Sequence, residues 1–278
     1  MEVRHASEAL IEPLNAEDLN LQGMADASPP KWHLAHTTWF FETFVLKPHH
    51  DDYVPADPRW GYLFNSYYEA VGPRQPRPQR GLLSRPPMHE VSAWRKRVNR
   101  ALEQLLEGNP EAPWLNLVEL GLHHEQQHQE LMLMDLLDGF SRQPLEPAYR
   151  SDWCDQFENQ PITAGDTTDP QTHDPWLDCH GGLVEVGHSG DAFHFDNEGP
   201  RHRTWLDPFS IASQLVSNGA YKRFIDDGGY ERPELWMSEG WAERSVRGWE
   251  APRYWRRDHD GQGPWRWEFT LAGRSPLK

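Results

Sequence analysis

LHHEQQHQEL, residues 122–131, is the stretch that decides the fold of this 278-residue chain. It lies within a segment, residues 114–137, whose apolar spacing predicts one long helix that ends at Gly139. His124 and His128 stand four positions apart, so they share one face of that helix and their imidazoles can converge on one metal ion. His123 points about 100° away from His124. The stretch therefore predicts a helix that carries part of a metal site.

A second helix that bears histidines is predicted upstream. It runs from residue 31 to residue 46, after the start signal Ser28-Pro29-Pro30. His33 and His36 lie three positions apart and near one face of it, and both are candidates for a third ligand. Three histidines without a carboxylate leave coordination positions open for substrate or dioxygen, and they suit zinc or ferrous iron. The spacing alone does not choose between these two metals.

Glu125 gives the same stretch a second interpretation. HEQQH, residues 124–128, matches the His-Glu-x-x-His pattern of zinc proteases, in which the glutamate is the general base. The glycine and histidine with which a metzincin would continue are absent from the following residues, and residues 140–180 predict no helix to supply a carboxylate ligand. A zinc hydrolase is therefore the second hypothesis. Glu130 and Asp135 are either partners that orient an imidazole N–H or solvated charges of the helix face.

The remaining pattern predicts a helical region followed by short strands. Two further helices are expected at 3–14 and 87–106, with a long loop over 48–87, and together the four helices suggest a bundle of the kind that builds metal sites from inward-facing side chains. After a polar, proline-bearing stretch, short strands are expected at 183–186 and 203–206 and a helix at 217–226. The residues after Tyr230 show no clear periodicity.

Composition excludes several classes of function. The chain holds 27 Lys and Arg against 43 Asp and Glu, a net charge of −16, which disfavours binding to nucleic acid. No apolar run is long enough for a membrane span, and the N-terminus shows no signal peptide. The two cysteines form no disulfide framework, so we expect a cytoplasmic protein. The sequence fixes no oligomeric state.

Several strings in order resemble one family, the EgtB-type sulfoxide synthases (hercynine oxygenases) of ergothioneine biosynthesis. The two histidine-bearing segments, residues 28–42 and 122–131, resemble the two halves of that family's metal site. The strings that resemble its connecting loop are 64–72 and 80–86, and those that resemble the opening of its formylglycine-generating-enzyme-like domain are 195–198, 208–211, 216–218 and 224–230.

The resemblance implies an α+β protein with a DinB-like four-helix bundle at residues 1–140, a linker at 141–180 and the N-terminal part of a C-type-lectin-like domain at 181–278. It also implies that His36, His124 and His128 hold one Fe(II). The implied substrates are hercynine (N-α-trimethylhistidine), O2 and a sulfur donor, either cysteine or γ-glutamylcysteine. The implied reaction joins hercynine and the thiol through a C–S bond and oxidises the sulfur to a sulfoxide.

Other roles follow from the same resemblance. Gln127 matches a position near the bound imidazole, and Tyr67 and Tyr68 match loop tyrosines that enter the active site. Arg80 and Arg85 stand where guanidinium groups could clamp the carboxylate of the sulfur donor. Members of the family continue past the position that matches Lys278, which makes the chain an apparent C-terminal truncation and adds a third hypothesis, a metal-binding fragment without turnover.

Overall fold

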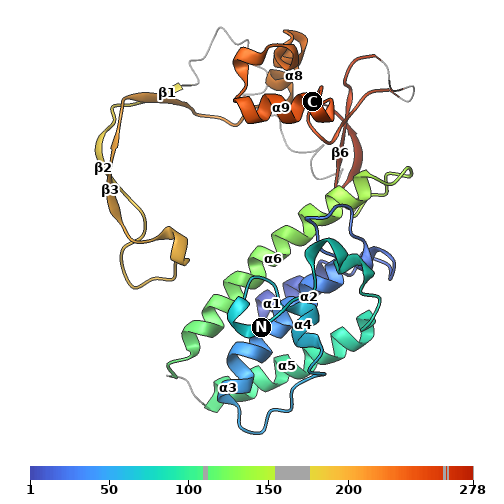
Figure 1. Ribbon diagram of the computed structural model, residues 1–278, viewed down its shortest axis with the longest axis vertical. Helices are drawn as coiled ribbons and strands as arrows, with labels where there is room; N and C mark the ends of the chain where they lie inside the picture. Colours follow the sequence, from blue (N-terminus) through green and yellow to red (C-terminus); the bar gives the residue numbers. More distant parts are fainter. Residues whose placement is uncertain (109–111, 154–175, 259–260, 262, 278) are drawn as a thin grey trace. The chain divides into compact units, whose positions relative to one another are not determined.

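The computed structural model describes residues 1–108, 112–153, 176–258, 261 and 263–277 (Figure 1). The chain divides into two compact units, the first made of residues 1–153 and 270–273 and the second of residues 154–269 and 274–278. The first unit is helical, and the second combines small sheets with short helices. This is the α+β class that the sequence predicts.

The first unit consists of α-helices, a π-helical turn, 3-10 turns and the loops that join them. Its α-helices are α1 (Glu2–Ala9), α2 (Pro30–Phe41), α3 (Lys47–His49), α4 (Trp60–Phe64), α5 (Met88–Gly108) and α6 (Leu115–Ser141). A π-helical turn, η2 (Glu42–Leu46), continues α2, and the 3-10 turns are η1 (Asp18–Asn20), η3 (Glu69–Val71) and η4 (Arg77–Leu82).

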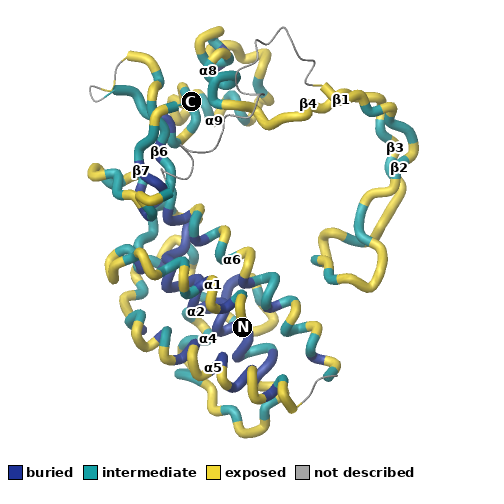
Figure 2. The backbone as a smooth tube through the Cα atoms, turned by 180° about the vertical axis from the view of Figure 1, so that it is seen from behind, coloured by how far each residue is buried: buried dark blue, intermediate teal, exposed yellow. Residues whose placement is uncertain are grey.

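Helix α2 is the centre of this unit. Every one of its residues is buried, and it packs against both α5 and α6, while α1 packs against α6. Figure 2 shows buried stretches in these helices. A helix that is apolar on all sides belongs in a core, and Trp32, Leu34, Trp39 and Phe40 supply that character here. The packing places the two histidine-bearing helices, α2 and α6, side by side.

The close approach of α2 and α6 depends on a glycine at position 121. A Cβ added there would lie 2.6 Å from Cε1 of Phe41 and 2.9 Å from Cε1 of Phe40, and both rings are fully buried. We expect Gly121→Ala to lower the free energy of unfolding by about 1–3 kcal/mol through overpacking. Gly61→Ala is the control, since no atom of the described residues lies within 4 Å of its added Cβ. Urea denaturation measures both variants, and equal stability of the two would contradict this explanation.

In its described residues, the second unit contains antiparallel strands and two short α-helices. In chain order its elements are β1 (Trp176–Cys179), β2 (Gly182–Val186), η5 (Asp196–Glu198), β3 (His202–Leu206), β4 (Phe209–Ala212), α8 (Asn218–Asp226), η6 (Gly229–Glu231), η7 (Pro233–Leu235), α9 (Ser238–Arg247), β5 (Trp255–Arg256), β6 (Trp267–Thr270) and β7 (Gly273–Pro276). Strand β1 pairs with β4, β2 pairs with β3, and β5, β6 and β7 form a three-stranded sheet.

Some element boundaries differ from the sequence-based expectation. Helix α1 ends at Ala9 rather than near residue 14, because the chain turns before Pro13, which cannot continue a helix interior. The region after Tyr230, expected to be irregular, contains α9 and the three-stranded sheet. Helix α9 has no buried residue, so the sequence gives no strong sign of a helix side that packs into a core.

Among the described residues, none of the helices combines the length and the apolar run that a bilayer crossing needs.

Candidate metal centre

Three histidines from α2 and α6 meet inside the first unit. Nε2 of His124 lies 3.3 Å from Nε2 of His36 and 3.1 Å from Nε2 of His128. One potential ligand atom from each of the three residues lies within 4.8 Å of the others. Nitrogens at these separations can all reach one ion at a metal–imidazole distance of about 2 Å. The structure thus brings together the three histidines to which the resemblance assigned the metal.

A backbone carbonyl selects the tautomer of His36. Its Nδ1 lies 2.5 Å from the carbonyl oxygen of Phe64, the last residue of α4. A carbonyl only accepts, so we assign the proton of the neutral ring to Nδ1, which leaves a lone pair on Nε2. The ring is stacked between Trp32 and Trp39, with centroids 4.7 and 5.5 Å away. The hydrogen bond and the two indoles together aim Nε2 at the other two histidines.

The tautomer of His128 follows from its neighbour His33. Nε2 of His33 lies 3.1 Å from Oδ2 of Asp135, and Nδ1 of His33 lies 2.8 Å from Nδ1 of His128. An ionised carboxylate only accepts, so Nε2 of a neutral His33 donates to Asp135 and its Nδ1 accepts from Nδ1–H of His128. His128 therefore also presents a lone pair on Nε2. Of the two acidic candidates, Asp135 is buried in this chain of hydrogen bonds, whereas Glu130 is exposed.

The three ligand candidates are neutral at neutral pH. Burial lowers the pKa of His36 and of His128 well below the ordinary value, and burial lowers the pKa of His124 to about 4. Nδ1 of His124 is buried and has no hydrogen-bond partner among the described residues. Lone pairs aimed at one point repel each other unless a cation lies between them. The donor set therefore fits a divalent metal of the kind that imidazole nitrogens bind.

The depressed histidine pKa values predict how the stability of the metal-free chain depends on pH. Between the ordinary histidine pKa of 6.5 and the folded value of about 4 for His124, the unfolded state binds more protons than the folded state. The free energy of unfolding should then decrease as pH falls through this window, by up to about 1.4 kcal/mol per pH unit for each such histidine. Urea denaturation at pH 7, 6, 5 and 4.5 measures this. The triple variant His36→Gln, His124→Gln and His128→Gln should show a shallower slope, and an equal slope would contradict the assignment.

Glu125 faces away from the triad. Its carboxylate accepts from Nη1 of Arg4 at 2.7 Å, from the Ser7 hydroxyl at 2.6 Å and from Nη2 of Arg95. Burial alone would raise the pKa of Glu125, but the two guanidinium groups and the serine hydrogen bond hold it below its ordinary value. These three partners occupy most of the acceptor positions of the carboxylate. Glu125 is fully buried among them, so it is not placed to take a proton from water at the metal. The zinc hydrolase hypothesis loses its general base.

A cavity of about 260 Å³ opens beside the triad. The lining combines His124 and His128 of α6, the N-terminal half of α2, and the segment between α4 and α5. The lining residues are Ser28, Trp32, His33, His36, Ser66, Tyr67, Tyr68, Arg77, Arg80, His124, Gln127, His128 and Leu131.

The structure brings most of the other candidate site residues to this cavity. Tyr67, Tyr68, Gln127 and Arg80 line it. Arg85 does not: it is exposed and donates to the carbonyl of the adjacent Ser84 at 3.1 Å.

Sequence reasoning missed Arg77, which lines the cavity together with Arg80. The two arginines stand three positions apart in the 3-10 turn η4, where side chains at i and i+3 lie on the same side. Their Arg-x-x-Arg spacing was the signal in the sequence.

Arg80 is a buried cation at the edge of this cavity. Only 4% of its surface is exposed; Nη1 donates to the Ser28 hydroxyl at 2.8 Å, and Nη2 to the Ser66 hydroxyl at 3.3 Å. Its guanidinium lies 3.4 Å above the Trp32 ring. Burial lowers the pKa of Arg80 to about 10, so it remains charged at neutral pH. A buried guanidinium held by two neutral hydroxyls attracts an anionic group of a ligand.

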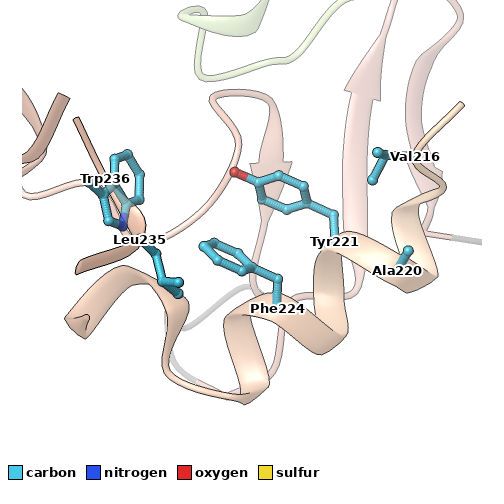
Figure 3. Close-up of a pocket in the computed structure, with 6 residues that line it drawn as sticks. All are labelled: Val216, Ala220, Tyr221, Phe224, Leu235 and Trp236. Carbon is cyan, nitrogen blue, oxygen red and sulfur yellow. The ribbon is translucent and has the colours of Figure 1, made fainter. Parts of the chain in front are cut away.

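The second unit holds a hollow of a different kind. Tyr221 and Phe224 project from α8 toward Leu235 and Trp236 and, with Val216 and Ala220, line a space of about 350 Å³ (Figure 3). Its polar atoms are already paired: Tyr221 OH lies 3.1 Å from Tyr230 OH, and Nε1 of Trp236 donates to the carbonyl of Gly229. None of the residues that line this hollow is a metal ligand. Among the described residues, His36, His124 and His128 are the group of side chains whose ligand atoms lie close enough together to hold one ion, so their cavity is the candidate site.

Comparison with known proteins agrees with the geometry. Residues 2–132 match the DinB superfamily, and residues 165–267 match the sulfatase-modifying factor enzyme 1-like domain. The chain therefore belongs to the proteins that join a DinB superfamily region to a sulfatase-modifying factor enzyme 1-like domain. Within this class it is a homologue of the hercynine oxygenases.

Two curated relatives show the extent of the similarity. The hercynine oxygenase of Mycolicibacterium thermoresistibile is 30% identical over 238 residues, which cover 83% of this chain and 48% of the relative. That of Mycolicibacterium smegmatis is 43% identical over 63 residues, 23% of this chain and 15% of the relative. The chain thus spans about half the length of the first of these relatives and a smaller part of the second.

Proposed function

We propose that His36, His124 and His128 hold one Fe(II) and that the chain acts on hercynine, a thiol and O2. The observation that carries this proposal is the convergence of three Nε2 atoms, 3.1 and 3.3 Å apart, at the wall of a cavity that also contains a buried arginine. The name hercynine oxygenase, carried by the homologues, supports hercynine as substrate. The family resemblance supports cysteine or γ-glutamylcysteine as the sulfur donor.

The proposed reaction balances without a further reductant. One C–H bond of hercynine and the S–H bond of the thiol break, and one C–S bond and one S–O bond form. Dioxygen accepts four electrons, and its atoms end in the sulfoxide and in one water. Ferrous iron, when bound, supplies the redox chemistry that dioxygen reduction needs, and three histidine ligands leave open positions for it.

The protein residues supply binding and proton control. Arg80 and Arg77 provide positive charge for the carboxylate of the thiol substrate. Tyr68 packs with its ring centroid 6.4 Å from those of both His36 and His124, and burial raises its pKa, so it stays protonated and able to donate a hydrogen bond. Tyr67 is exposed, and its hydroxyl accepts from Nη1 of Arg77 at 3.0 Å. Gln127 offers an amide to the imidazole of hercynine.

Oxygen uptake by the Fe(II)-loaded chain tests this function. The chain is loaded anaerobically and given hercynine with cysteine, hercynine with γ-glutamylcysteine, or each substrate alone. Uptake only when both substrates are present, together with a product that has the mass of both plus one oxygen and minus two hydrogens, would support the proposal. Iron binding without uptake would support the metal-binding fragment, and peptide or amide hydrolysis by the zinc-loaded chain would support the hydrolase.

Arg80 and Arg85 form a matched pair for testing thiol recognition. We expect Arg80→Met to raise KM for the thiol by about 10–100-fold, because a charge-assisted hydrogen bond contributes about 1.5–3 kcal/mol. Arg85→Met removes the same charge from the exposed side of the same loop and should leave KM within about twofold. Steady-state oxygen uptake measures both. A higher KM in the Arg85 variant alone would restore Arg85 to the site and remove Arg80 from it.

A further inference from the structure

A buried series of hydrogen bonds runs from Asp135 through His33 to His128. Asp135 and His128 lie seven positions apart on α6, two turns along one face, and His33 of α2 lies between them. His33 is 2% exposed and Asp135 is 9% exposed, so water does not compete for these hydrogen bonds. The links are 3.1 Å from Asp135 to His33 and 2.8 Å from His33 to His128.

We propose that Asp135 and His33 are positioning residues that hold His128 in the tautomer and orientation in which its Nε2 can bind a metal. This inference rests on the proposed metal-binding function of the triad. A hydrogen-bonded carboxylate behind a ligating histidine fixes the ring and strengthens the nitrogen as a donor. Here the carboxylate of Asp135 acts on His128 indirectly, because His33 lies between them.

Two further contacts hold Asp135 and the His33 ring in place. The backbone N–H of Ser28 donates to the same Oδ2 of Asp135 at 2.8 Å, which anchors the carboxylate at the start of α2. The His33 ring meets the buried Trp32 ring edge-on, with centroids 5.7 Å apart, and this contact restricts its rotation. The Ser28 hydroxyl in turn accepts from Arg80. The support of His128 is therefore continuous with the arginine that we assign to the substrate anion.

The other two histidines of the triad are supported differently. His36 donates to a backbone carbonyl, which no side-chain substitution removes. Nδ1 of His124 has no partner in the part of the chain that the structure describes. His128 is therefore the member of the triad whose tautomer depends on replaceable side chains. This difference makes the inference testable at His33 and Asp135 without touching a ligand.

The test measures the affinity of the full chain for Co(II) by competition with a chelating dye, together with the Co(II) d–d absorption. His33→Leu removes the acceptor for Nδ1–H of His128, and Asp135→Asn removes the carboxylate; each should weaken Co(II) binding by about 10–100-fold. His33→Asn places an amide oxygen close to the position of Nδ1 and should stay within about fivefold. Glu130→Gln removes an exposed acid from the same helix and should leave the affinity unchanged.

A second measurement needs no substitution. In the Zn(II)-loaded chain with 15N-labelled histidine, NMR should show His128 protonated on Nδ1 and His33 protonated on Nε2. The reverse assignment for His33 would overturn the inference, as would Co(II) binding by His33→Leu and Asp135→Asn as tight as that of the unaltered chain. Failure of the unaltered chain to bind Co(II) would overturn the proposed function as well, whereas metal binding with these tautomers but no turnover would count against the reaction alone.

Discussion

His124→Ala is expected to abolish tight iron binding. Nε2 of His124 lies within 3.3 Å of Nε2 in both other histidines, so the variant keeps only two of the three candidate ligands. Losing an outer partner of a ligand typically costs about 10–100-fold in metal affinity, and losing the ligand itself should cost more than that range. Anaerobic equilibrium dialysis against Fe(II), followed by metal analysis, measures the effect.

His123→Ala is the matched control for that experiment. It removes an imidazole from the adjacent position of α6, which does not belong to the triad. The His123 variant should bind one Fe(II) per chain with the affinity of the unaltered protein. One equivalent of tightly bound iron in the His124 variant would remove His124 from the site.

Glu125→Gln is expected to lower the free energy of unfolding by about 3–5 kcal/mol, the range for breaking a buried ion pair from one side. Glu125 is fully buried, and Arg4 and Arg95 are each 1% exposed. Without the carboxylate, both guanidinium groups remain buried with only part of their negative counter-charge, since the other acid that pairs with Arg95 is the half-exposed Glu8. The substitution should therefore destabilise the whole fold, although Glu125 stands next to the candidate ligand His124 in the sequence.

Urea denaturation measures this loss, and the exposed Glu130→Gln on the same helix should change stability by less than about 0.5 kcal/mol. The same Glu125 variant separates the metal hypotheses. Below its unfolding transition it should still bind metal, because Glu125 turns toward Arg4 and Arg95 rather than the triad. A Glu125 variant as stable as the parent chain, but without hydrolytic activity that the parent possesses, would instead support the zinc hydrolase.

The pair of histidines on α6 could be predicted because helix geometry is local. Histidines at i and i+4 of a helix share one face, so the sequence alone predicts that His124 and His128 lie close together. The choice between His33 and His36 could not be made that way, because the two positions are close on α2. It depends on the packing of α2 against α6, which brings Nε2 of His36, rather than a nitrogen of His33, next to His124.

The loop residues were harder to predict for a different reason. Arg77, Arg80 and Arg85 lie in a segment without apolar periodicity, so the hydrophobic pattern does not show which of them turns inward. The 3-10 turn η4 and the serine partners of Arg80 decide it. The interpretation of Asp135 as a possible solvated charge failed similarly: Ser28 and His33, its partners, lie about a hundred residues earlier in the chain.

Iron K-edge X-ray absorption of the anaerobically Fe(II)-loaded chain tests whether His36, His124 and His128 bind iron together. We expect three imidazole nitrogens at about 2.0–2.2 Å, with the outer-shell scattering of histidine rings, and loss of this signal in His124→Ala. A first shell made of carboxylate or sulfur atoms, or a histidine signal that survives in His124→Ala, would contradict it.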